Sequence, residues 1–244
     1  MGATRKATPL RNETMYDSFN AMPDNITRVS RLGFVNAYLV REDDGLTLVD
    51  TMLPRSSKAI LEAAETLGAP IVRIALTHAH GDHIGSLDEL AAALPGVEVL
   101  ISTRDARLLA KDMSLDPGEP VDKLRGGYPG AKTRPTRTFQ PGETVGSLEV
   151  VASPGHTPGH VSFLDRRDGT LIAGDAYSTL GGVATPARPN PRFPLVYFAS
   201  WHRPMALESA RALRALDPKR LAPGHGRIVD APGPAMDRAI AKAT

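Results

Sequence analysis

The stretch THAHGDH at residues 77–83 places four potential metal ligands within six residues, namely His78, His80, Asp82 and His83. It follows directly on an apolar segment that is expected to form a buried strand. Because residues two apart in an extended chain face the same way, His78 and His80 can reach one metal ion, while the turn that follows directs Asp82 and His83 toward another. Imidazole and carboxylate are the ligands that zinc accepts where thiolate is missing, and the sequence contains no cysteine.

Three further segments place a histidine or an aspartate beside glycine where a predicted strand ends. They are PGHTPGH at 154–160, AGD at 173–175 and PGH at 223–225. Glycine lets the backbone turn sharply and approach a metal ion closely. A histidine-rich polar turn would explain one such segment but not four, so we expect His156, Asp175 and His225 to join the first four ligands.

Hydrophobic patterning between these segments predicts an alternation of strands and helices. The expected strands are 26–30, 35–40, 46–50, 71–76, 97–101, 148–152, 161–165, 170–173 and 220–222. The expected helices are 56–67, 86–94, 205–216 and a short one at the C-terminus. Ser86 and Glu89 have the spacing of a capping box. Residues 111–135 and 178–200 lack periodicity; the first is long enough to lie over a site, although a solvated surface loop is the alternative interpretation.

The composition is that of an ordinary globular protein. A formal net charge of +2 over 244 residues indicates no nucleic-acid partner. No apolar run approaches the roughly 18 residues of a membrane span, so we expect no membrane partner and a cytoplasmic location. Residues 1–24 are polar and are expected to form an arm, followed by a single domain over 25–244. The sequence leaves a homodimer open.

The four histidine- and aspartate-bearing segments resemble the metallo-β-lactamase superfamily, whose pattern is His-x-His-x-Asp-His followed by a His, an Asp and a final His. LVDT at 48–51 resembles the strand-end motif of the same family. The resemblance covers nearly the whole chain. It implies an α/β fold, a four-layer αββα sandwich in which two mixed β-sheets are flanked by helices.

The resemblance also implies a division of the ligands between two divalent ions per chain, most readily Zn²⁺, with Fe, Mn or Co as alternatives. His78, His80 and His156 would hold one ion, and Asp82, His83 and His225 the other. Asp175 would bridge them. Asp50 and His160 would orient ligands through hydrogen bonds, or would serve only as structural hydrogen-bonding residues.

Such a centre suits hydrolysis of an ester-type carbonyl. Two divalent ions, two aspartates and a bridging hydroxide leave a charge of about +1, which favours a transition state that gains an anion. Zinc lowers the pKa of bound water to about 7, so hydroxide is available without a side-chain nucleophile. Asp82 could accept the proton released when the tetrahedral intermediate collapses. A purely structural metal site would instead be a closed cage of four ligands.

Within the resemblance, N-acyl homoserine lactonases share all seven ligands and a tyrosine just past the bridging aspartate, which suggests that Tyr177 contacts the reacting oxygen. The apolar residues between 193 and 201 could line a pocket for an acyl chain, or form core or a dimer contact. His202 fits no ligand position. Glyoxalase II-like thioester hydrolases are the main alternative, although they carry a helical C-terminal domain for glutathione, and 19 residues follow His225. An oxygenase or a phosphodiesterase is a weaker alternative.

Overall fold

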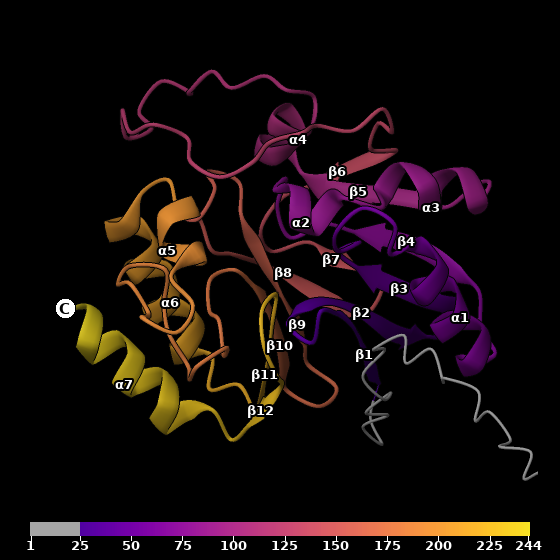
Figure 1. The fold of residues 1–244 in the computed structure, drawn as a ribbon. Helices are drawn as coiled ribbons and strands as arrows, with labels where there is room; N and C mark the ends of the chain where they lie inside the picture. Colours follow the sequence, from indigo (N-terminus) through magenta and orange to yellow (C-terminus); the bar gives the residue numbers. More distant parts are fainter. Residues whose placement is uncertain (1–24) are drawn as a thin grey trace, which may run out of the picture.

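Two six-stranded mixed sheets form the centre of the protein. The computed structural model describes residues 25–244 (Figure 1), and the arm expected for residues 1–24 lies outside the described residues. The first sheet has the order β1-β2-β3-β4-β5-β6; its strands are β1 (Ile26–Arg31), β2 (Val35–Glu42), β3 (Gly45–Val49), β4 (Ile71–Ala75), β5 (Glu98–Ser102) and β6 (Arg137–Phe139). The second has the order β12-β11-β10-β9-β8-β7; its strands are β7 (Thr144–Val145), β8 (Leu148–Ala152), β9 (Val161–Asp165), β10 (Thr170–Gly174), β11 (Arg220–Pro223) and β12 (Val229–Asp230).

Helices cover the outer face of each sheet, as Figure 1 shows. Beside the first sheet lie α1 (Ser57–Leu67), α2 (Gly81–Ile84), α3 (Leu87–Ala93) and α4 (Thr103–Leu109), and beside the second lie α5 (Leu195–Ala199), α6 (Arg203–Ala215) and α7 (Gly233–Ala243). The predicted four-layer αββα architecture is therefore confirmed. Among residues 25–244, no helix combines the length and the apolarity needed to cross a membrane.

The buried apolar side chains form three clusters, one in each space between adjacent layers. Strand β2 shows why: Ala37 and Leu39 pack toward the helices, while Tyr38 and Val40 pack between the sheets. Successive side chains of a strand point to opposite faces, so a strand buried on both faces has a continuous apolar sequence. The third cluster joins the second sheet to α6 and α7 through residues such as Leu213.

Most of the predicted elements are found within one or two residues of their expected bounds. The prediction of a capping box at Ser86 was wrong, because the side chain of Ser86 makes no capping hydrogen bond to α3. Its hydroxyl instead donates to the carbonyl of Leu53 and accepts from the amide of Ser56. Helix α4, the short helices α2 and α5 and the short strands β6, β7 and β12 were not predicted.

Sheet topology brings the ends of several strands to one edge of the sandwich. Strands β3 and β4 are parallel neighbours in one sheet, and β10 and β11 are parallel neighbours in the other. The residues directly after these four strands are Asp50, the segment 76–83, Asp175 and the segment 224–226. Carboxyl ends of parallel strands meet at one edge, so chemistry-bearing loops from both sheets converge there.

Candidate metal centre

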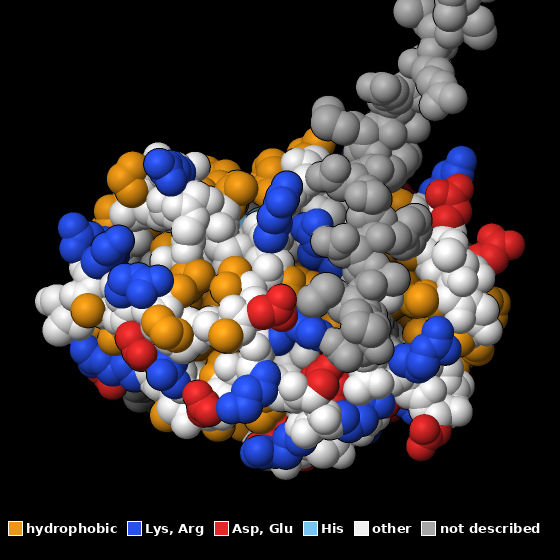
Figure 2. Space-filling model, turned by 90° about the horizontal axis from the view of Figure 1, so that it is seen from below, with side chains coloured by type: hydrophobic (Ala, Val, Ile, Leu, Met, Phe, Trp, Pro, Cys, Tyr) orange, Lys and Arg blue, Asp and Glu red, His pale blue; other side chains and the backbone are white. Residues whose placement is uncertain are grey.

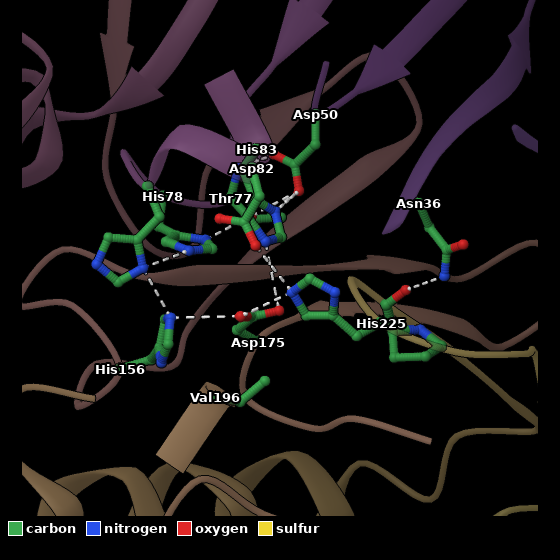
Figure 3. Close-up of polar contacts among 12 residues, drawn as sticks. Asn36, Asp50, Thr77, His78, Asp82, His83, His156, Asp175, Val196 and His225 are labelled. Carbon is green, nitrogen blue, oxygen red and sulfur yellow. Dashed lines mark hydrogen bonds and ion pairs between the residues drawn. The ribbon is translucent and has the colours of Figure 1, made fainter. Parts of the chain in front are cut away.

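The structure gathers all seven expected ligands at this edge, and Figure 3 labels all of them except His80. They form three overlapping groups, and within each group the ligand atoms lie within 4.8 Å of one another. The groups are His78, His80 and His156; His78, His83 and Asp175; and Asp82, His83 and His225. All seven side chains are buried except that of Asp82, which is 36% exposed.

The first group presents bare imidazole nitrogens to one another. His80 Nδ1 lies 3.2 Å from His78 Nε2 and 2.9 Å from His156 Nε2. His80 Nε2 donates to the carbonyl of Arg125 at 2.9 Å, and burial lowers the pKa of His80 to about 4, so its Nδ1 carries no proton. Burial also lowers the pKa of His78 and of His156 well below the usual value. Neutral lone pairs this close together fit a cation lying among them.

The second and third groups pair imidazoles with carboxylates. His83 Nδ1 donates to Asp50 Oδ2 at 2.8 Å, which leaves His83 Nε2 facing Asp175 Oδ1 at 3.4 Å. Neither of these two buried atoms has a hydrogen-bond partner. His225 Nε2 lies 3.2 Å from Asp82 Oδ2. Buried polar atoms without partners are costly unless a ligand satisfies them, so these two groups also fit a divalent cation.

Asp175 lies between the first group and the third group. Its Oδ2 is 3.3 Å from His156 Nε2 and 3.3 Å from His225 Nε2. Burial alone would raise the pKa of Asp175, but His225 and His83 outweigh it and hold the pKa well below its usual value. Burial likewise lowers the pKa of His225, whereas Asp175 and Asp82 outweigh that effect and raise it to about 9. The carboxylate of Asp175 is thus ionised and lies between the first and third groups.

Asp50 and His160 form hydrogen bonds to ligand residues: Asp50 to His83, and His160 to Asp175. Asp50 accepts from the amide and the hydroxyl of Thr77, both at 2.8 Å, as well as from His83. His160 Nε2 accepts from the backbone amide of Asp175 at 3.0 Å. Burial lowers the pKa of His160 to about 3, so this acceptor stays unprotonated. Both residues therefore fix the orientation of a neighbouring ligand.

Three residues that support the ligand loops were not found from the sequence. Asn36 in β2 donates to the carbonyls of Pro223 and Gly226, at 2.9 and 2.7 Å, and so holds the loop that carries His225. Ser200 Oγ lies 2.9 Å from His156 Nδ1. The sequence carried a signal for Asn36, because it is the only amide side chain in β2 and stands between the apolar residues Val35 and Ala37.

The third is Asp105, a fully buried carboxylate in the first turn of α4. It accepts from the amide of Ala79 at 3.0 Å, from Thr157 Oγ1 at 2.8 Å and from the amide of Gly159 at 2.8 Å. Ala79 separates two ligands of the first group, and Thr157 follows the third. Burial raises the pKa of Asp105 to about 6 although these donors lower it. Asp105 thus joins the two loops that supply the first group.

The long segment 111–135 lies over the centre rather than in solvent alone. The Arg125 carbonyl contacts His80, and the amide of Gly81 donates to the carbonyl of Gly127 at 3.0 Å. The ring of Tyr128 lies over His80 with 4.5 Å between ring centroids. This segment therefore closes one side of the site.

A pocket of about 250 Å³ opens beside the ligands. Its lining includes Asp82, Asp175 and three of the histidines, and its walls are apolar, formed by Phe34, Leu53, Phe193, Leu195, Val196 and Ala199. The described lining contains no Lys or Arg. Phe198 is one of the apolar residues that were expected to line a pocket, but it is not part of this lining and is 61% exposed.

Tyr177 is not brought to the pocket. Its side chain is fully buried among α6, α7 and the second sheet, and its hydroxyl donates to the carbonyl of Ala210 at 2.8 Å. This corrects the expectation that Tyr177 contacts the reacting oxygen. His202 caps α6 by accepting from the amide of Met205, and Trp201 donates from Nε1 to the carbonyl of Asp122 in the segment over the site.

Comparisons with known proteins agree with this geometry. A family model described as the metallo-beta-lactamase superfamily matches residues 30–225. The chain is 48% identical over 210 residues to the uncharacterized protein YobT of Bacillus subtilis (strain 168), covering 86% of this chain and 90% of that one. It is 33% identical over 198 residues to a hydroxyacylglutathione hydrolase of Acidiphilium cryptum (strain JF-5), covering 80% of this chain and 65% of that one.

Among solved structures, the fold is similar to TTHA1623 in a di-iron-bound form. The TM-score is 0.61 at 26% identity, and the match covers 84% of this chain and 94% of that chain. That protein carries iron in a fold of this kind, so the fold is compatible with metals other than zinc.

Proposed function

Because the chain belongs to the metallo-beta-lactamase superfamily and is a metal-dependent hydrolase of that family with buried His/Asp metal-binding clusters, we propose that it hydrolyses neutral esters with an apolar acyl group. N-acyl homoserine lactones represent this substrate class best. The observation that carries the proposal is the apolar pocket, free of Lys and Arg in its described lining, that opens beside the ligands.

The proposed ligand division follows the two outer groups of the centre. His78, His80 and His156 would hold one divalent ion, Asp82, His83 and His225 the second, and Asp175 both. When bound, two such ions polarise a scissile carbonyl and make hydroxide available at neutral pH. Zinc is the first candidate, and iron is the alternative that the di-iron form of TTHA1623 supports.

Asp82 is the residue best placed to accept a proton during hydrolysis. It lines the pocket and is the most exposed of the seven ligands. Burial raises its pKa, but His83 and His225 outweigh that effect and keep it well below the usual value. Its carboxylate is therefore ionised at neutral pH and can accept a proton when a tetrahedral intermediate collapses.

The walls of the pocket argue for an uncharged acyl group. A substrate that carries carboxylates would place them against Phe34, Leu53 and Phe193 without a cationic partner, and an unpaired buried charge is strongly unfavourable. A glutathione conjugate is such a substrate. The relationship to hydroxyacylglutathione hydrolases keeps thioester hydrolysis as a second candidate, although this chain spans 65% of the relative compared above.

The test is a hydrolysis panel on protein of known metal content. It compares N-acyl homoserine lactones with acyl chains of 4 to 12 carbons, a hydroxyacyl glutathione thioester, a phosphodiester and a β-lactam. Each buried methylene contributes about 0.8 kcal/mol, so two more carbons should raise kcat/KM by roughly tenfold until the pocket is filled. No turnover of any acyl lactone, with efficient turnover of the thioester or the phosphodiester, would refute the proposal.

Two neighbouring residues supply a matched pair of variants. Phe34 lines the pocket, whereas Leu32 is 65% exposed and is not part of it. Phe34→Ala should weaken the dependence of kcat/KM on chain length, and Leu32→Ala should leave it unchanged. Equal effects of the two variants would show that the acyl chain does not bind in this pocket.

A further inference from the structure

A second cavity, of about 490 Å³, lies between α7 and the segment 181–191. It shares no lining residue with the apolar pocket at the metal centre. Its polar lining is dominated by three cationic side chains, Arg188, Arg238 and Lys242. No Asp or Glu is found in the described lining.

The spacing along α7 explains why cations meet here. Ala235, Arg238, Ala239 and Lys242 follow one another at intervals of three, one and three residues, so they share one face of the helix. Arg188 approaches from the opposite side and donates to the carbonyl of Lys242. The two walls of the cavity therefore contribute positive charge to the same space.

The neighbouring acidic side chains do not neutralise this charge. On α6, Glu208 pairs with Arg211 at 2.6 Å, and on α7, Asp237 pairs with Arg214 at 2.8 Å. Neither acid lines the cavity. Figure 2 shows Lys and Arg side chains gathered on this face, on the side where α7 lies.

The cavity also offers a hydroxyl and apolar surface. Thr185 lines it, is 5% exposed, and its buried Oγ1 has no hydrogen-bond partner. Val183, Pro189 and Ala239 form apolar parts of the wall. An unsatisfied buried hydroxyl is costly, and a bound acceptor would remove that cost.

We propose that this cavity binds a small phosphate monoester. Arg238, Lys242 and Arg188 would surround the phosphate, because guanidinium and ammonium groups form the strongest hydrogen bonds to phosphate oxygens. The apolar wall would contact the organic part of the ligand. This site is separate from the proposed hydrolytic site and does not depend on it.

The test is an amide NMR titration of the metal-loaded protein with phenyl phosphate, with phenol as the uncharged counterpart. Phenyl phosphate should shift the amide signals of Gly181, Gly182 and Ala239 with saturation, and phenol should not. Higher salt should weaken the binding. Arg238→Gln should weaken it on the order of tenfold, the effect of one charge-assisted hydrogen bond.

Arg134→Gln is the matched control, because Arg134 is also exposed and lies outside the cavity. It should bind phenyl phosphate like the original protein. Three results would each overturn the proposal: no saturable shifts at the cavity, shifts confined to the loop that carries His225, or equal weakening by both variants. The second result would identify the metal centre as the site that binds phosphate.

Discussion

Gly224 is the position where one methyl group should disturb the metal centre without changing any ligand. A Cβ at this residue would lie 2.5 Å from Asp175 Oδ1 and 2.6 Å from His83 Cε1. Ordinary contacts of a Cβ are 3.4–4 Å, so Gly224→Ala must displace one of these side chains by about 1 Å, and both are buried in a close-packed interior. Metal–ligand bonds in such sites are about 2.0–2.2 Å, and a shift of this size breaks one.

We therefore expect Gly224→Ala to lower metal affinity by about 10- to 100-fold or more, the range seen when ligand orientation is lost, and to cost about 1–3 kcal/mol of unfolding free energy from overpacking. Metal retention after dialysis against a graded series of chelator concentrations measures the affinity. Gly127→Ala is the control, because its Cβ meets nothing within 4 Å although Gly127 lines the same pocket. Wild-type metal retention and turnover in Gly224→Ala would refute the packing argument.

Two further predictions concern residues beside the centre. Tyr177→Phe should lower the free energy of unfolding by about 0.5–1.5 kcal/mol through loss of the bond to Ala210, with metal content and kcat unchanged; a large fall in kcat alone would restore a catalytic role. The pKa of Asp105 is about 6 in the folded protein, whereas its ordinary value is 3.8. At pH values between these two pKa values, the folded state binds more protons than the unfolded state, so the stability of the protein falls as the pH rises. In chelated protein, the urea-unfolding free energy of wild type relative to Asp105→Asn should therefore fall by about 2 kcal/mol from pH 4 to pH 6, and a constant difference would contradict it.

The sequence predicted the longer strands and the gathering of the seven residues because each has a local signature, but it did not predict the short strands β6, β7 and β12. Strand β2 carries the continuous apolar run 37–40, and the ligands stand in clusters beside glycine at strand ends. Clustered imidazole and carboxylate groups have few structural uses, so composition and spacing were sufficient. The strand order then brought the four segments together.

The failures concern residues whose role depends on tertiary contacts. Asp105 stands in the first turn of a helix, where an aspartate usually faces solvent, and only the packing of α4 against two loops buries it. Tyr177 was assigned from its distance along the chain, but α6 supplies the carbonyl that its hydroxyl contacts. Ser86 has the spacing of a cap, yet contacts with a distant loop use its hydroxyl. The segment 111–135 has no periodicity from which its position could be derived.

The stoichiometry of bound metal decides whether the centre is dinuclear. Elemental analysis of folded protein, after removal of loosely bound ions by gel filtration, should give close to two divalent transition-metal ions per chain, because seven ligand side chains form two triads with Asp175 between them. One ion per chain, or none, in fully folded and hydrolytically active protein would contradict a dinuclear centre.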